Sequence, residues 1–130
     1  MNIRSYLSQG RPLLFDGGMG TLFAARSGGT AEQCERANVN QPEEILAIHR
    51  AYLKAGCRAV KPNTFSLGTM FATGRDSEGA ALIEAGCRLA GEAAEPYGAF
   101  VFADLGPAPQ FEKEPGQLYC RRRRAGDLPA

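Results

Sequence analysis

Three short segments with strand character alternate with helical patterns along this chain. Residues 12–16 (PLLFD) and 99–105 (AFVFADL) are apolar runs, and residues 57–61 form a shorter segment centred on Val60. Glycine or proline follows each segment at once. A continuous run such as 99–105 is typical of a strand covered on both faces of a parallel sheet. We therefore predict three short strands, of which the first and third are buried.

Helical periodicity fills the intervals between these segments. The clearest helix begins at Pro42, carries two glutamates in its first turn and ends at Gly56, with an apolar stripe on Ile45, Ile48, Tyr52 and Leu53. A second long helix is predicted over residues 76–95, with a stripe on Leu82, Ile83, Cys87, Leu89 and Ala90. Short helices are predicted over residues 3–7 and 21–26, and loops over residues 30–41 and 62–74.

The order strand, loop, helix, strand predicts an α/β fold with right-handed parallel crossovers. Both a (β/α) barrel and a doubly wound sheet are compatible with this order. The pattern stops after Pro109, so residues 1–109 are expected to form the domain and residues 110–130 an irregular basic tail. A frameshift or a misplaced gene end would produce such a change in composition.

Composition and charge are those of a soluble globular chain. Of the 130 residues, 44% are apolar and 22% charged, and the net charge is +1. The five Lys/Arg and three Asp/Glu of residues 110–130 give the tail +2 and leave −1 for the rest. Neither a membrane span nor a signal peptide is present in the pattern, so we expect a cytoplasmic protein with no nucleic-acid or membrane partner. The arginines at 121–124 are expected to be solvated.

The cysteines and the single histidine do not form a metal-binding motif. Cys34, Cys57, Cys87 and Cys120 are widely separated, without a CxxC or CxxH pair, which excludes a zinc finger. Cys57 and Cys87 lie beside apolar segments and are expected to be buried and reduced. His49 lies in mid-helix, one position from the apolar stripe, and is expected to be a structural, partly exposed residue.

Polar side chains and glycines follow each predicted strand. They are Asp16-Gly17-Gly18, Asn63-Thr64-Phe65 and Asp104-Leu105-Gly106-Pro107. In parallel α/β folds the carboxyl ends of the strands form the ligand-binding edge. Glycines there let backbone amides approach a polar ligand, and Asp16 can accept a hydrogen bond from an ammonium group. The alternative is a tight turn with a capping aspartate.

A nicotinamide site is not expected after the first strand. Gly18-Met19-Gly20 supplies only part of the dinucleotide fingerprint, because Phe23 stands where the third glycine is needed.

Four motifs in order carry a resemblance to a known family. D-G-x-M-G-T at the first strand end, C-E…N…P-E at the entry to the clear helix, I-H-x-x-Y within it, and N-T-F after the second strand make residues 12–109 similar to the homocysteine S-methyltransferase family. The resemblance implies the first three β/α units of a TIM (β/α)8 barrel, which is incomplete without the other five.

The resemblance also implies a function. The family transfers a methyl group to the thiol of homocysteine to give methionine, and three cysteines hold a zinc ion that makes this thiol a thiolate. Asp16 and Gly17 would contact the amino-acid part of homocysteine, with Asn63 and Thr64 as weaker contacts. The donor would be methylcobalamin, methylfolate or S-methylmethionine. A chain of three units would be the N-terminal part of such an enzyme, inactive alone.

Two departures from the family pattern limit what is carried over. Pro62 stands where members commonly have threonine, and proline has neither a hydroxyl nor an N–H donor. The family's zinc cysteines come late in the barrel, and no cysteine here matches them, so neither a metal ligand nor a catalytic residue is assigned. Such a fragment would be inactive alone or completed by another chain. The alternative is a non-catalytic short protein that self-associates through its open sheet edges or its basic tail.

The cysteine pattern predicts that the purified chain does not hold stoichiometric zinc. Metal analysis after dialysis against a weak chelator measures this directly. One tightly held zinc ion per chain would contradict the expectation.

Overall fold

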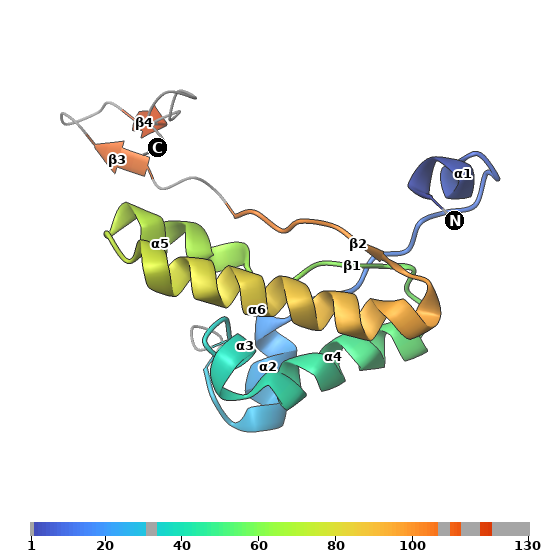
Figure 1. Ribbon diagram of the computed structural model, residues 1–130, viewed down its shortest axis with the longest axis horizontal. Helices are drawn as coiled ribbons and strands as arrows, with labels where there is room; N and C mark the ends of the chain where they lie inside the picture. Colours follow the sequence, from blue (N-terminus) through green and yellow to red (C-terminus); the bar gives the residue numbers. More distant parts are fainter. Residues whose placement is uncertain (1, 31–33, 107–109, 113–117, 121–130) are drawn as a thin grey trace.

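The computed structural model is an α/β structure, mostly helical with a small parallel sheet, and describes residues 2–30, 34–106, 110–112 and 118–120 (Figure 1). Within these ranges no helix is both long and apolar enough to cross a membrane. The elements are α1 (Ile3–Leu7), α2 (Gly20–Ser27), α3 (Ala37–Asn40), α4 (Pro42–Lys54), β1 (Ala59–Val60), η2 (Phe65–Leu67), α5 (Gly68–Ala72), α6 (Asp76–Ala94), η3 (Glu95–Tyr97), β2 (Phe100–Val101), β3 (Gln110–Glu112) and β4 (Leu118–Cys120).

The three predicted strand segments lie side by side and parallel. Ala59 of β1 pairs with Phe100 of β2, and on the other side it forms a parallel bridge with Phe15. The Asp16 amide donates to the Ala59 carbonyl at 2.9 Å. β1 is therefore the central segment, with residues 12–16 and β2 on its two sides. This confirms the predicted parallel arrangement, in which the carboxyl ends of all three segments meet at one edge.

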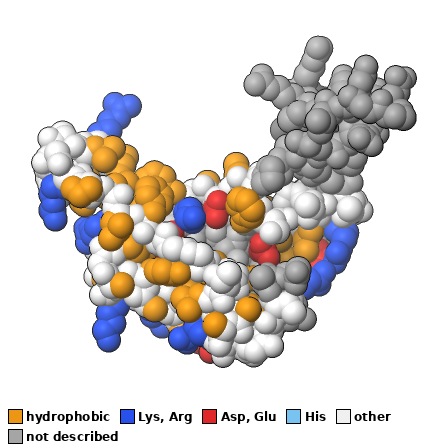
Figure 2. All heavy atoms as spheres, turned by 180° about the vertical axis from the view of Figure 1, so that it is seen from behind, with side chains coloured by type: hydrophobic (Ala, Val, Ile, Leu, Met, Phe, Trp, Pro, Cys, Tyr) orange, Lys and Arg blue, Asp and Glu red, His pale blue; other side chains and the backbone are white. Residues whose placement is uncertain are grey.

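The first and third segments are less buried and less regular than predicted. Leu14 is 60% exposed, Val101 43% and Leu105 84%. The expectation of burial on both faces is wrong because the long helices α4 and α6 lie on one side of the strands (Figure 1). The short helix α1 packs against the sheet through Tyr6 and Phe100, but it leaves Leu14 and Val101 exposed. Figure 2 shows hydrophobic side chains gathered on the surface of the molecule seen from behind.

The core lies between the sheet, α4 and α6. Ile45 and Ile48 of α4 are completely buried, as are Ala90 and Ala93 of α6. Alanine at the contact positions lets two helices approach closely without leaving voids. Both helices begin and end within two residues of the predicted positions, so the 3.6-residue periodicity was sufficient to place them.

Cys57 is buried as expected, but Cys87 is exposed. The prediction for Cys87 is wrong because this residue lies on the flank of α6 that borders a groove with Phe65 and Phe71, away from α4. The helical period placed the apolar stripe of α6 correctly, but fewer residues of that stripe are buried than predicted.

Several short elements escaped the sequence patterns. α3 lies inside the predicted loop 30–41, and η2 and α5 lie inside the predicted loop 62–74. Elements of three to five residues are too short to show a period, and α3 (ANVN) is built largely from residues of low helix propensity. The tail was predicted as irregular, yet β3 and β4 pair antiparallel, with Gln110 opposite Cys120. Backbone pairing of this length requires no side-chain pattern.

His49 is fully buried, which corrects the expected partial exposure. α4 packs against α2 and α3 as well as α6, so its buried surface is wider than one stripe. Neither ring nitrogen has a hydrogen-bond partner in the described residues. Burial without a partner lowers the pKa of His49 from its ordinary 6.5 to about 4, because the charged form is poorly solvated there.

Acid is therefore expected to destabilise the fold through His49. Between pH 6.5 and 4 the unfolded chain binds a proton that the folded chain excludes, so the free energy of unfolding falls as pH falls. Its contribution from pH 7 to pH 5 is about 2 kcal/mol. Urea unfolding at both pH values measures it. The His49→Leu variant should lose less stability over this range, and equal losses in both proteins would contradict the assignment.

Candidate functional site

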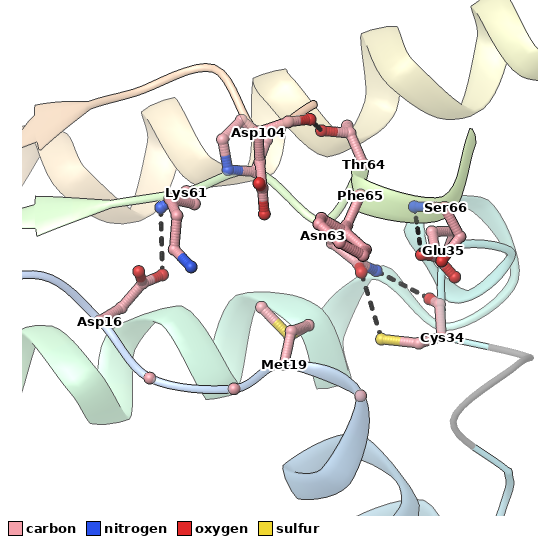
Figure 3. Close-up of a pocket in the computed structure, with 14 residues that line it drawn as sticks. Asp16, Met19, Cys34, Glu35, Lys61, Asn63, Thr64, Phe65, Ser66 and Asp104 are labelled. Carbon is pink, nitrogen blue, oxygen red and sulfur yellow. Dashed lines mark hydrogen bonds between the residues drawn. The ribbon is translucent and has the colours of Figure 1, made fainter. Parts of the chain in front are cut away.

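A pocket of about 350 Å³ lies at the carboxyl edge of the sheet. It is lined by residues 16–20, Cys34, Glu35, residues 61–66 and Asp104 (Figure 3). All three predicted strand ends contribute, so Asp16, Gly17, Asn63 and Thr64 are brought together as the sequence predicted. The volume is in the range of small-molecule pockets.

Asp16 has one carboxylate oxygen held and one left without a partner. Its Oδ2 accepts a hydrogen bond from the Lys61 backbone N–H at 3.0 Å, across the first two strand segments. Its Oδ1 is buried and has no hydrogen-bond partner in the described residues. Burial raises the pKa of Asp16, the Lys61 N–H and the Lys61 charge oppose this, and the Asp104 charge adds to it. Oδ1 is an acceptor that a bound donor can satisfy.

Packing against Tyr52 favours glycine at position 17. A Cβ atom at this position would lie 2.8 Å from the Tyr52 hydroxyl oxygen. That hydroxyl donates to the Gly18 carbonyl at 2.8 Å, so Tyr52 of α4 clamps the segment that follows the first strand. A purely structural role in a tight turn therefore explains Gly17. It does not explain why Oδ1 of Asp16 is buried without a partner in the described residues.

Asn63 and Thr64 hold the walls of the pocket. The Asn63 amide nitrogen donates to the Cys34 carbonyl and to Asn38 Oδ1, both at 2.8 Å, and its Oδ1 accepts from Cys34 Sγ. The Thr64 hydroxyl donates to the Asp104 carbonyl at 2.8 Å, which ties β1 to the third segment. Each side chain lines the pocket, but its donors are used within the fold.

Asn38 was missed by the sequence analysis. Its side-chain nitrogen donates to the carbonyls of Asn63 and Leu82, and the residue is 1% exposed. Gly86 of α6 leaves the space for it, since a Cβ there would lie 2.7 Å from the Asn38 nitrogen. The only signal was the position of Asn38 inside the C-E…N…P-E motif, because a lone asparagine in a loop has no period.

Glu35 and Lys61 were missed as well. Glu35 Oε1 accepts from the Ser66 amide at 3.1 Å and so joins the segment before α3 to η2. Lys61 directly precedes Pro62 at the end of the second strand, which was the available signal for it. Both residues line the pocket, Glu35 beside Ser66 and Lys61 on the side of Asp16 (Figure 3).

The carboxyl ends of parallel strands are the usual position of a small-molecule site in α/β folds, and the pocket lies there. A sequence profile of the homocysteine S-methyltransferase family matches residues 13–123. The chain therefore belongs to the homocysteine S-methyltransferase family.

A solved structure supports this assignment. The chain resembles the metallated homocysteine methyltransferase MmuM of Escherichia coli, with 26% identity and a TM-score of 0.65. The similarity covers 82% of this chain and 42% of MmuM, so the chain spans less than half the length of that relative. No curated protein sequence gives a significant match.

The described residues do not fit a zinc site. They contain no group of three His, Cys, Asp or Glu side chains that could hold a metal ion. Cys34 donates to Asn63, and burial, together with the Glu35 charge, raises the pKa of its thiol to about 11. Burial also raises the pKa of Cys57, and Cys87 lies exposed on α6. A cysteine binds zinc as its thiolate, and burial disfavours the thiolate at Cys34 and Cys57.

The contact between Gly86 and Asn38 predicts opposite effects for two alanine substitutions in α6. Gly86→Ala should lower the free energy of unfolding by about 1–3 kcal/mol, because the new methyl group collides with a locked amide. Gly91→Ala meets no atom within 4 Å and should raise it by up to about 1 kcal/mol through helix propensity. Urea unfolding of both variants checks this, and shifts of the same sign would contradict it.

Proposed function

We propose that this chain binds homocysteine for methylation of its thiol to methionine, and that Asp16 holds the α-ammonium group. The observation that carries the proposal is the buried, unpartnered Oδ1 of Asp16 in a pocket at the strand ends. Charge-assisted hydrogen bonds between an ammonium group and a carboxylate are among the stronger polar contacts in proteins. Membership of the homocysteine S-methyltransferase family supplies the substrate.

The proposed fold is a set of the first three units of a (β/α)8 barrel. Support comes from the parallel order of residues 12–16, β1 and β2, with the long helices α4 and α6 on one side. In a closed barrel such strands are paired on both edges and covered on both faces, so the remaining units would bury these exposed apolar residues. The domain limits at residues 1–109 and the tail at 110–130 stay part of this proposal.

The described residues bind and orient the amino acid, and we assign none of them to the methyl transfer itself. Asp16 binds the ammonium group, the Gly17 backbone lies beside it, and Asn63 and Thr64 hold the pocket open. Zinc, which the family resemblance implies, has no fitting ligand set among the described residues. The methyl donor is not assigned.

A second candidate function is association without catalysis. The exposed apolar side chains of Leu14, Phe15, Val101 and Leu105 favour it, because exposed strand edges and apolar faces pair readily with other chains. Ligand binding that depends on Asp16 distinguishes the two functions, since association through this face does not use a buried carboxylate.

Asp16→Asn is expected to weaken homocysteine binding by about ten- to a hundredfold. The amide oxygen can still accept from the Lys61 N–H, so the substitution removes charge with little change in shape. Isothermal titration calorimetry on the full chain measures the affinity.

Two controls accompany this titration. Glu84→Gln removes a carboxylate from an exposed position of α6 outside the pocket and should leave binding unchanged. The ligand 4-sulfanylbutanoate lacks the ammonium group and should bind Asp16→Asn no more weakly than the unmodified chain. Unchanged homocysteine affinity in Asp16→Asn would refute the role of Asp16.

A further inference from the structure

The charges that line the pocket are unequal. Three carboxylates, those of Asp16, Glu35 and Asp104, face it, together with one ammonium group, that of Lys61, among the described lining residues. Such a pocket attracts a cation and repels an anion, unless the anion lies beside the lysine. An α-amino acid carries both charges on one carbon atom, so its carboxylate needs a local partner.

Lys61 is placed to be that partner. Its backbone N–H is bound to Asp16 Oδ2, which holds the residue at the pocket wall, while its side chain is only half-buried. No ion pair joins its ammonium group to a described carboxylate, whereas Arg26, Arg36 and Arg50 are each paired with a glutamate. In Figure 3 the Lys61 side chain points toward the side of the pocket that holds the Asp16 carboxylate.

We infer that Lys61 binds the carboxylate of the amino acid whose ammonium group Asp16 binds, and so makes the pocket selective for α-amino acids over simple amines. The inference rests on the proposed function and adds the residue that decides the substrate class. The bound amino acid would lie between Asp16 and Lys61, with its ammonium group at Asp16 and its carboxylate at Lys61. Pro62, the next residue in the wall, has no N–H and no hydroxyl to donate.

The first turn of α2 is the competing partner for the carboxylate. Gly20 begins this helix beside the pocket, and no side chain caps its amides. Helix N-termini bind anions through these groups. Binding of the carboxylate by Lys61 depends on the Lys61 side chain, whereas binding at the start of α2 does not.

The test compares two ligands that differ only in the carboxylate, homocysteine and 3-aminopropane-1-thiol. We expect the full chain to prefer homocysteine by about tenfold or more. Lys61→Met should abolish this preference while binding the aminothiol as well as before or better, because a positive charge has left a site for a cation. That retained binding shows that the variant is folded. Lys61→Arg should keep the preference, and Lys54→Met, at an exposed lysine of α4, should not change it.

Each outcome decides between the inference and the function on which it rests. If homocysteine binds in an Asp16-dependent manner and Lys61→Met keeps the preference, the carboxylate lies elsewhere and only the role of Lys61 is refuted. If homocysteine does not bind the unmodified chain, the proposed function fails and the inference with it. Lys61→Gln provides a second neutral variant, and a preference retained there would refute the role of Lys61 equally.

Discussion

The buried hydrogen bonds of the Asn63 side chain join the parts of this structure that form the pocket. They connect the end of β1 to the segment before α3 through Cys34 and to α3 through Asn38, which in turn binds the Leu82 carbonyl of α6. Each buried donor left without its partner would cost about 1–3 kcal/mol. Because the network spans segments distant in the sequence, its loss would separate the walls of the pocket and not merely weaken one of them.

The hydrogen-bonding groups of the Asn63 network have partners, whereas two charged side chains of the pocket each have a group that lacks one among the described residues. Asp16 Oδ1 is buried without a partner, and Lys61 lies nearby without an ion pair in the described chain. Stability alone favours pairing such groups with each other or replacing them. Groups left unsatisfied in an otherwise satisfied site are typical of binding sites, where the ligand completes the set. The homocysteine S-methyltransferase family, to which the chain belongs, is the basis for proposing homocysteine as that ligand.

The sheet is packed by helices on one side and leaves apolar side chains exposed elsewhere. Its helical side forms a close-packed core, with Val60 completely buried, while Leu14 and Val101 on neighbouring segments are largely exposed. The pocket lies at the carboxyl edge and depends on backbone pairing among three segments, of which β1 is the centre. The geometry of the pocket therefore depends on the order of the strands and on the Asn63 network.

The sequence by itself determined the elements whose signal is local. The periodic stripes of α4 and α6, the parallel order of the strands and the position of Asp16 and Gly17 at a strand end were all predictable, as was the family. The tertiary structure alone decided the burial of His49, the exposure of Cys87 and the placement of α3. It also decided that Asn63 is a structural hub and that Lys61 faces Asp16. The physical reason is that burial and hydrogen-bond partners depend on which distant segments pack together, whereas periodicity and turn chemistry depend only on neighbours along the chain.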